Sequence, residues 1–455
     1  MSNASGAAQA ARHDVDICII SAMHPSLNPR VVKEADALSE AGFSVGLIAP
    51  DYAPTLREMD RALLEAKPWR ILARPRFGPH APTGLRVAEL ARRAAAEVAV
   101  GRLGFAAEAL QRAYLHPVAP ALAAAAARVR ARLYSGHLVP GLAAASYAAR
   151  RQGAPYAFDA EDFHPGDLPD TAEHAAWIRA VRRLESRALP GAAYVTAASP
   201  LIARAYAQAY GIAAPTTILN VFPRDRAPSG PTPRGWAHEG PSVYWVSQTI
   251  GPDRGLECLI EAVGRSRARP QIHLRGAIGA ESYARRLRGF AAEKGVADRL
   301  HFAPLAPPDD MARLAAAHDL GFVGEVGRTP NRKIMLTNKQ FTYFLAGVPA
   351  VMSDIPSHRA FAAGLEPAAT LFRCEEPDDL ARGLDALLCD PERLAAARRA
   401  AFRLGQERFN WDREKQALQA LARGVLGAAA PAPGDDLESL DPERPERRAE
   451  EAIAS

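Results

Sequence analysis

Short apolar runs alternate with amphipathic stretches along most of the chain. Residues 15–20 form an apolar run with several β-branched side chains, which is typical of a buried parallel strand. Asn28 and Pro29 then begin a predicted helix that runs to about Ala41, because asparagine is a good N-cap and proline a good first helical residue. A second apolar run at 43–49 predicts the next strand. These three elements make a β-α-β unit with a right-handed parallel crossover.

The same alternation continues well into the second half of the chain. Further apolar runs predict strands at 157–160, 193–197, 217–220, 242–246, 271–274, 300–302, 320–323, 348–351 and 369–372. Helices are predicted at 255–263, 338–347, 377–388 and 411–426. Residues 222–240 are rich in proline, glycine and arginine and show no periodicity, which predicts a linker.

This order of elements predicts an α/β protein with two Rossmann-like, doubly wound domains that face each other across a cleft. Ligands bind beyond the carboxyl ends of the strands in such sheets, so the cleft is the expected site. The expected segments are a disordered N-terminus (1–13), an N-terminal domain (14–225), a linker (226–240), a C-terminal domain (241–408), a helix packing back towards the N-terminal domain (409–427) and a disordered acidic tail (428–455).

Composition restricts the class of protein. Hydrophobic residues make up 48% of the chain and charged residues 24%, ordinary values for a soluble globular protein, and 455 residues suit two domains. No apolar run is long enough to span a membrane, and the first residues lack the apolar core of an export signal. The four cysteines lie far apart without metal-type spacing, which favours a reduced, cytoplasmic compartment.

The formal net charge of +5 conceals an asymmetry along the chain. Residues 428–455 hold eight acidic and three basic residues, whereas residues 57–132 hold fourteen Arg and Lys against six Asp and Glu. A basic, Ala- and Leu-rich helical region suits anionic lipid headgroups, and hence a peripheral position on the inner face of the cell membrane, or an anionic acceptor. The alternative is a solvated helix face. Nucleic acid is not an expected partner, because no aromatic residues interleave with the arginines.

The most informative local pattern is a short helix at 338–347 that turns directly into a buried strand. Lys339 lies at the start of this helix, where unpaired backbone N–H groups and the helix dipole favour an anion. A lysine fixed there can hold a diphosphate as a point charge. The alternative is an ordinary helix–turn–strand with a solvated lysine.

Four motifs occur in an order and spacing that resemble the GT-B nucleotide-sugar glycosyltransferases, specifically the large retaining group called family 4. They are NPRVVKEADALSEAGF at 28–43, FDAED at 158–162, DRGLE at 253–257 and NKQFTYFLAGVP at 338–349. The resemblance covers residues 15–426. It implies the two-domain GT-B fold and transfer of a sugar from a nucleoside-diphosphate sugar.

The resemblance also implies roles for individual residues. It places the counterparts of Arg254 and Lys339 at the donor diphosphate, where cationic groups neutralise the charge of the leaving group. His137 matches a family histidine, with Leu138 in place of the following aspartate, and is expected to bond hydroxyls of the transferred sugar. The alternatives are a surface position for Arg254 and a satisfied turn histidine at position 137.

Other polar residues are expected to line the same cleft. Arg30 would steer donor phosphate or an anionic acceptor, and Glu161 and Asp162 would position or deprotonate an acceptor hydroxyl; each is otherwise a surface residue. Gln248 and Thr249 would contact the donor or cap a turn. The predicted catalytic residues are His137, Glu161, Asp162, Arg254 and Lys339, and the predicted donor-binding residues are Arg30, Gln248, Thr249, Arg254, Gly276, Asn331, Asn338, Lys339 and Thr342.

The chain departs from its family at one pair of positions. Many members carry two glutamates eight residues apart, and the second binds the ribose; by register these positions are Ile334 and Thr342. Threonine still donates and accepts a hydrogen bond but cannot make the charge-assisted contact. This departure suggests altered donor choice, weak donor affinity or loss of catalysis, and Asn331 is a candidate for compensation.

Metal dependence is not expected. The only Asp-x-Asp sequence, Asp14-Val15-Asp16, precedes the first strand and so lies at the wrong edge of the sheet. The acidic residues and histidine at 161–164 have spacing that fits no standard metal site. We expect no cofactor other than the donor substrate.

The sequence therefore predicts a cytoplasmic, metal-independent, retaining hexosyltransferase with a saccharide or lipid-linked acceptor, serving cell-surface polysaccharide assembly. Retention would follow from leaving group and nucleophile sharing one face, since no carboxylate is credibly placed as a covalent nucleophile. Two alternatives remain open: a non-catalytic binding or scaffold protein on this fold, and a nucleotide-sugar 2-epimerase-like enzyme.

Overall fold

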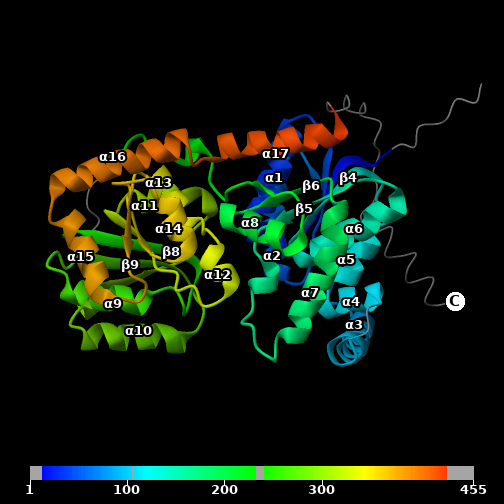
Figure 1. Cartoon of the computed structure of the whole chain (residues 1–455), viewed down its shortest axis with the longest axis horizontal. Helices are drawn as coiled ribbons and strands as arrows, with labels where there is room; N and C mark the ends of the chain where they lie inside the picture. Colours follow the sequence, from blue (N-terminus) through cyan, green and yellow to red (C-terminus); the bar gives the residue numbers. More distant parts are fainter. Residues whose placement is uncertain (1–12, 105–106, 232–239, 428–455) are drawn as a thin grey trace, which may run out of the picture. The chain divides into compact units, whose positions relative to one another are not determined.

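The structure is a computed structural model that describes residues 13–104, 107–231 and 240–427. The expected disorder at 1–12 and 428–455, and most of the linker, lie outside these residues. Contacts divide the chain into two compact units, which are described separately (Figure 1). Unit 1 holds the chain up to Glu161, Ala172–Thr196 and the residues from Leu418 onward, and unit 2 holds Asp162–Thr171 and Ala197–Ala417. The prediction instead gave continuous domains at 14–225 and 241–408, with the helix at 409–427 packing back towards the first.

The first sheet has seven strands in the order β3-β2-β1-β4-β5-β6-β7. Its strands are β1 (Val15–Ile20), β2 (Val45–Ile48), β3 (Arg70–Ala73), β4 (Ala131–His137), β5 (Tyr156–Ala160), β6 (Tyr194–Ala197) and β7 (Thr216–Thr217). β1 pairs in parallel with both β2 and β4. The predicted strands at β1, β2, β5 and β6 are confirmed to within two residues at each end, and β7 is shorter than predicted. β3 and β4 were not predicted, although β4 is central in the sheet.

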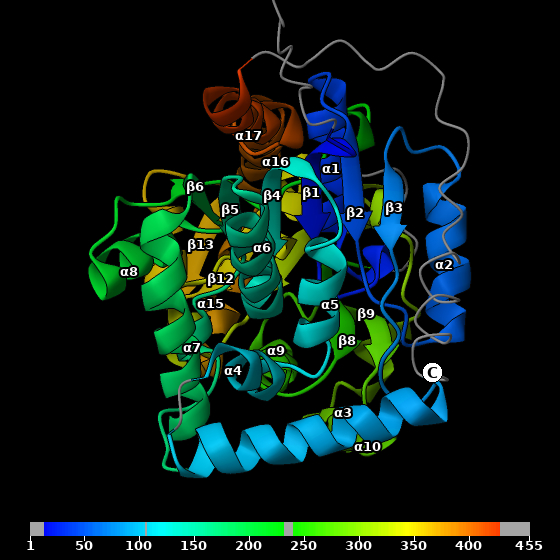
Figure 2. The same cartoon turned by 90° about the vertical axis from the view of Figure 1, so that its right-hand side faces the viewer.

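Helices accompany this sheet along the chain. They are α1 (Pro29–Glu40), α2 (Pro54–Leu64), α3 (Thr83–Ala96), α4 (Glu108–Leu115), α5 (Ala119–Ala126), α6 (Leu138–Gln152), α7 (Ala175–Ala188) and α8 (Pro200–Tyr210). The predicted cap of α1 is confirmed, because the Asn28 side chain accepts a hydrogen bond from the Val31 N–H. α5 and α6 lie side by side against β4 and its neighbours (Figure 2).

The second sheet has six strands, all parallel, in the order β10-β9-β8-β11-β12-β13. Its strands are β8 (Ser242–Ile250), β9 (Gln271–Ile278), β10 (Leu300–Ala303), β11 (Leu320–Val323), β12 (Ala350–Ser353) and β13 (Ala369–Phe372). Each of these strands was predicted. β8 and β9 run four residues further than expected, so Gln248 and Thr249 lie within β8.

Helices cover both faces of the second sheet. They are α9 (Leu256–Arg265), α10 (Glu281–Glu293), α11 (Met311–Ala315), α12 (Pro330–Ile334), α13 (Lys339–Leu345), α14 (Pro356–Ala362), α15 (Pro377–Leu388) and α16 (Pro391–Glu407). α9 and α10 lie on one face, and α11 and α13 lie on the other (Figure 1). The core under α9 includes the fully buried Trp245, Leu259 and Phe322, and each such side chain contributes roughly 1.5–3 kcal/mol by leaving water.

The last helix, α17 (Trp411–Leu426), has the bounds that the sequence predicts. Its residues from Leu418 onward belong to unit 1. There the Gln419 amide donates to the Ala37 carbonyl at 2.8 Å, and Arg132 donates to the Leu426 carbonyl at 2.6 Å. These bonds attach the end of the helix to α1 and β4.

The backbone after β8 approaches the end of β11 very closely. Gly255 has a φ of +67°, and a Cβ placed there would lie 2.5 Å from the carbonyl oxygen of Gly324. Gly211 has a similar φ of +64°, but a Cβ there would meet nothing within 4 Å. Alanine at position 211 would therefore incur only the cost of the left-handed backbone conformation. Alanine at position 255 would incur that cost and a steric clash as well.

We expect Gly255→Ala to lower the free energy of unfolding by roughly 3 kcal/mol, because it adds a clash to the left-handed backbone penalty. The matched change Gly211→Ala should lower it by only about 1 kcal/mol. Urea unfolding of both variants measures the difference. Equal losses would show that the approach of the two backbones is not a constraint.

Candidate functional site

Three cationic side chains in unit 2 converge on one buried carboxylate, that of Glu325. Lys339 Nζ lies 2.8 Å from Glu325 Oε1. Arg254 Nη1 and Arg332 Nη1 lie 2.8 and 3.3 Å from Glu325 Oε2. Three positive charges share one negative charge, so the cluster keeps an excess of positive charge that an anionic ligand can neutralise.

Four neighbouring elements place these residues. Glu325 follows β11 by two residues, and Arg254 precedes the first residue of α9 by two. The close approach of Gly255 and Gly324 brings the loop after β8 against the end of β11. Arg332 lies on α12, whose N-terminus is capped by the side chain of Thr329, and Lys339 is the first residue of α13. The cluster thus lies beyond the carboxyl ends of parallel strands, where ligands bind in such sheets.

The charges in the cluster shift one another's ionisation. Burial alone would raise the pKa of Glu325, but the charges of Lys339 and Arg254 outweigh it and lower that pKa to about 2. Burial lowers the pKa of Lys339, and the two guanidinium groups lower it further, against the opposing effect of Glu325. Glu325 is therefore ionised at neutral pH, and Lys339 carries its charge at a cost.

The cations differ in their access to solvent. The side chains of Arg254 and Arg332 are 22% and 37% exposed, whereas that of Lys339 is 5% exposed. Lys339 lies behind the carboxylate, with Nζ 5.6 Å from the centre of the Trp245 ring. Lys339 was expected to contact the donor diphosphate directly. In the structure its ammonium group contacts Glu325, and an anion at the surface would contact Arg254 and Arg332 first.

Sequence reasoning did not find Glu325 or Arg332. A usable signal was present, because an acidic residue two positions beyond a buried parallel strand lies at the edge where ligands bind. The expectation that Arg254 and Lys339 lie close together is met, since both contact the same carboxylate.

The side chain of Asn331 joins α12 to the 162–171 segment of unit 2. Its side-chain nitrogen donates to Asp162 Oδ1 and to Asp167 Oδ1, both at 2.8 Å. Its side-chain oxygen accepts the N–H of Phe163 at 2.9 Å. All three bonds hold the 162–171 segment against α12, so the amide has no hydrogen left for a ribose. This geometry argues against the suggested compensation by Asn331. The Asp162 carboxylate accepts one of these bonds and so contacts α12. Glu161, the preceding residue, is half-buried.

The remaining donor-binding candidates are divided between surface and interior. Gln248 and Thr249 are exposed on β8. Gly276 is buried in β9, where a Cβ would lie 2.5 Å from the Ser247 carbonyl oxygen, so its glycine serves strand packing. Asn338 precedes α13, and its carbonyl accepts the hydroxyl of the buried Thr342 at 2.9 Å. The threonine is therefore satisfied within its own helix.

Unit 1 buries a second network of charges. Arg30 donates from Nε and Nη2 to the two oxygens of Asp159, at 2.6 and 2.7 Å. His137 Nε2 lies 2.9 Å from Glu34 Oε2, and its Nδ1 lies 3.3 Å from Asp159 Oδ2. Thr196 and Ser135 donate hydroxyls to Asp159 and Glu34. Each carboxylate therefore faces a basic side chain and accepts a hydrogen bond from a hydroxyl group.

This network holds two of the predicted site residues. His137 is the last residue of the central strand β4, where the sequence predicts a loop, and it is fully buried. Arg30 is also buried, because its bidentate pairing with Asp159 compensates for the loss of hydration. Each side chain contacts the buried carboxylates of unit 1.

Asp14 and Asp16 lie at the start of β1, as the sequence predicts. Asp16 pairs with Arg132 at 2.9 Å and accepts the hydroxyl of Ser44. Among residues 13–104, 107–231 and 240–427, no three His, Cys, Asp or Glu side chains gather as metal ligands.

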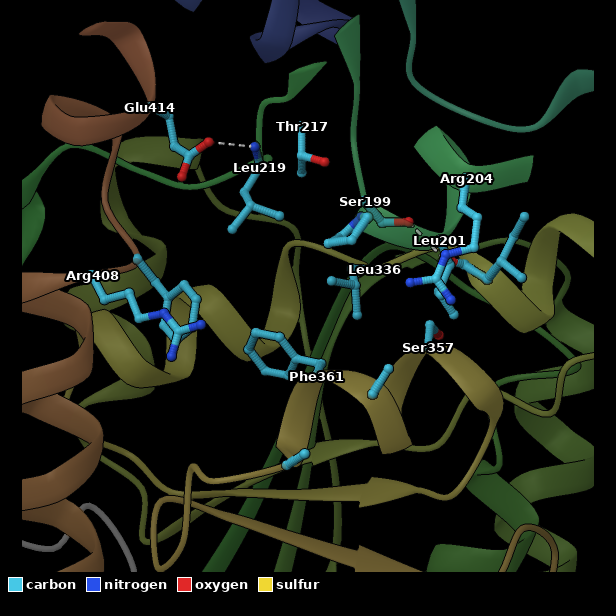
Figure 3. A pocket seen from close by; sticks show the side chains of 15 residues that line it. Ser199, Leu201, Arg204, Thr217, Leu219, Leu336, Ser357, Phe361, Arg408 and Glu414 are labelled. Carbon is cyan, nitrogen blue, oxygen red and sulfur yellow. Dashed lines mark hydrogen bonds between the residues drawn. The ribbon is translucent and has the colours of Figure 1, made fainter. Parts of the chain in front are cut away.

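A cavity of about 500 Å³ in unit 2 is separate from the Glu325 cluster. Figure 3 shows Phe361 and Leu336 pointing into it, with Arg204 and Arg408 at its sides. Glu414, at its edge, accepts the N–H of Leu219 at 2.7 Å. Ile334 lines this cavity, and its carbonyl accepts the hydroxyl of Ser199. None of the predicted catalytic residues lines the cavity.

Solved structures with the same fold identify the architecture. HepE from Anabaena, in complex with UDP, is 17% identical with a TM-score of 0.64, and the match covers 90% of this chain and 100% of that one. Sucrose-phosphate synthase from Thermosynechococcus elongatus is 16% identical with a TM-score of 0.67, covering 91% and 100%. A glycosyltransferase from Rickettsia africae is 10% identical with a TM-score of 0.61, covering 91% and 99%.

The chain has the GT-B fold. This confirms the fold class that the sequence predicts, with two Rossmann-like parallel sheets. No family model matches the chain, and no curated protein matches it in sequence. The GT-B likeness therefore rests on structure.

Removing the charge of Glu325 should destabilise unit 2. We expect Glu325→Gln to lower the free energy of unfolding by roughly 3–5 kcal/mol, because it leaves the buried Lys339 without a counter-ion. The double variant Glu325→Gln/Lys339→Met should recover most of that loss. Denaturant unfolding of the single and double variants measures the coupling, and simple additivity of their effects would contradict it.

His137 should make stability depend on pH. Burial alone would lower its pKa, but the carboxylates of Glu34 and Asp159 outweigh burial and raise that pKa from 6.5 to about 10. The folded state then binds a proton that the unfolded state releases, so the stabilisation is complete below pH 6.5 and is lost as the pH rises towards 10.

In the wild type this contribution should fall by up to about 1.4 kcal/mol per pH unit in that range. His137→Gln should remove this part of the slope, since it cannot take up the proton. Unfolding free energies at pH 7, 8 and 9 for both proteins measure the difference. Parallel pH profiles would show that His137 is neutral in the folded protein.

Proposed function

We propose that the protein is a retaining glycosyltransferase that moves a sugar from a nucleoside-diphosphate sugar to a saccharide or lipid-linked acceptor. The observation that carries the proposal is the convergence of Arg254, Arg332 and Lys339 on Glu325, beyond the carboxyl ends of β8 and β11. The cluster has an excess of positive charge and two partly exposed guanidinium groups. A diphosphate is the natural anion for such a group, because planar guanidinium forks bind phosphate oxygens in pairs.

The cluster suits the chemistry of sugar transfer. Breaking the bond from the anomeric carbon to the diphosphate places negative charge on the leaving group. Fixed cations stabilise that charge best when they are held in place before the reaction, since no reorganisation is then needed. Glu325 holds Arg254, Arg332 and Lys339 together through direct contacts within the protein. We propose that the cations do this without a metal ion.

The structural neighbours support the donor class. HepE has been solved with UDP-glucose and with UDP and glucose, and one further neighbour is a lipopolysaccharide outer core galactosyltransferase. We extend the proposal to hexose transfer of the family 4 type, in cell-surface polysaccharide assembly, by a cytoplasmic protein at the inner face of the cell membrane. The shared GT-B fold and the basic segment of unit 1 support this setting.

A second candidate function is donor binding without catalysis. Thr342 stands where the family has a ribose-binding glutamate, and its hydroxyl is used within α13. Asn331 is likewise engaged with the 162–171 segment. A protein with the phosphate contacts but without the ribose contact would hold a nucleotide sugar weakly and transfer nothing.

A thermal-shift screen against UDP-, GDP-, ADP- and dTDP-sugars tests the donor site, because a ligand that binds only the native state raises its melting temperature. We expect at least one donor to stabilise the protein. Arg254→Ala should weaken the binding of that donor by roughly tenfold or more, since charge-assisted hydrogen bonds are lost.

Lys339→Ala should slow sugar transfer strongly while the protein stays folded.

Arg313→Ala is the matched control, because Arg313 is an exposed arginine of unit 2 that pairs with Asp310. Its donor binding should equal that of the wild type. The absence of any stabilising nucleotide, or equal effects of the two arginine changes, would refute the assignment of the site. Binding without product formation would favour the second candidate, and conversion of the donor without any acceptor would indicate an epimerase.

A further inference from the structure

The cavity in unit 2 combines an apolar floor with charged sides. Phe361 and Leu336 point into it (Figure 3). The Phe361 ring packs on the buried Phe409, with ring centroids 5.2 Å apart. The volume of about 500 Å³ falls within the range of roughly 300–1,000 Å³ that is typical of small-molecule sites. Such a floor favours the nonpolar part of a ligand, because binding there removes apolar surface from water.

Two arginines at the sides of the cavity lack carboxylate partners. Arg204 lies on α8 and Arg408 directly follows α16, and both residues are exposed. Neither forms an ion pair with another residue within 13–104, 107–231 and 240–427. The carboxylate of Glu414, which also lines the cavity, accepts the N–H of Leu219 at 2.7 Å. Two cations against one engaged carboxylate leave an excess of positive charge, which favours an anionic group.

The side of the cavity near Arg204 is the better place for that anion. Figure 3 shows Ser199 and Ser357 on this side of the cavity and Glu414 on the other. Ser199 caps the N-terminus of α8, where the helix dipole favours negative charge. Arg204 lies one turn further along the same helix. An anion on this side therefore meets a guanidinium group and a helix N-terminus, and it lies away from the Glu414 carboxylate.

The hydroxyl of Ser357 adds a hydrogen-bond donor on the same side. Ser357 lines the cavity from α14 and is 2% exposed, yet its Oγ forms no hydrogen bond with any residue that the structure describes. Buried hydroxyl groups are normally hydrogen-bonded, because they lose their contacts with water. Rotation about the Cα–Cβ bond breaks no existing bond and can turn the hydroxyl towards the cavity. The side chain is therefore able to donate to a bound anion.

We propose that this cavity binds a small amphipathic carboxylate, of the size of a medium-chain fatty-acid anion. The carboxylate would accept two parallel hydrogen bonds from the Arg204 guanidinium group and a third from the Ser357 hydroxyl. The apolar chain would then lie over Leu336 and Phe361. A cationic head group would be repelled by both arginines, and a neutral one would gain no charge-assisted bond. None of these residues belongs to the Glu325 cluster, so the proposal does not rest on the proposed transferase activity.

Isothermal titration calorimetry of the full-length protein with octanoate, octanol and octylammonium tests the proposal. We expect octanoate to bind at one site per chain, and the neutral and cationic homologues to bind at least about tenfold more weakly, because they lack the negative charge. Arg204→Ala should weaken octanoate binding by roughly tenfold and leave octanol binding unchanged. Hexanoate should bind roughly tenfold more weakly than octanoate, since two fewer methylene groups leave water.

Ala360→Phe tests the location of the site, because Ala360 is exposed on α14 and lines the cavity. The larger side chain should weaken the binding of octanoate and octanol alike, by roughly tenfold or more. Arg285→Ala is the matched control, because Arg285 is an exposed arginine of α10 that lies outside the cavity. Its octanoate binding should equal that of the wild type.

The proposal fails if octanoate does not bind the wild type, or if octanol binds as tightly as octanoate. It also fails if either Arg204→Ala or Ala360→Phe keeps the octanoate affinity of the wild type while circular dichroism shows the variant folded.

Discussion

A single buried carboxylate holds together the part of unit 2 that is suited to chemistry. Without Glu325, the side chains of Arg254, Arg332 and Lys339 would repel one another at the end of β11. With it, each has a partner within 3.3 Å, and the group still keeps a positive excess. Buried ion pairs add little net stability by themselves, because desolvation offsets attraction. Their value here is geometric: the carboxylate fixes three cations at one place before any ligand arrives.

Unit 1 uses the same kind of interaction for a different purpose. Arg30 and His137 face the carboxylates of Asp159 and Glu34, and all four side chains are buried. This inaccessible network joins α1 to the ends of β4 and β5. The Glu325 cluster differs in being partly exposed and in having three cations for one carboxylate, which is why we propose it as the anion site.

The elements could be predicted from the sequence because they depend on local patterns. The apolar runs at β1, β11 and β13 gave the right bounds, and Asn28 gave the start of α1. β4 was missed because Arg132, Ser135 and Gly136 interrupt its apolar pattern, although the strand is central. The same error misplaced His137: a residue at the end of a buried strand was taken for one in a loop.

The charge cluster was only partly predictable, because it is assembled over long separations. Glu325 meets Lys339 across 14 residues and Arg254 across 71, and Gly255 must approach Gly324 before these contacts form. No periodic pattern in the local sequence predicts contacts over such separations. Lys339 and Arg254 were found because motifs mark them, whereas Glu325 is marked only by its place after a strand.

The lowered pKa of Lys339 has a thermodynamic consequence for any anion that binds beside it. A phosphate close to the ammonium group favours its charged form and so raises that pKa again. Wherever a fraction of the lysine is neutral before binding, the complex must then take up protons from solution. Binding of an anion beside a partly neutral Lys339 would therefore be linked to proton concentration, and its heat of association would vary with the ionisation enthalpy of the buffer.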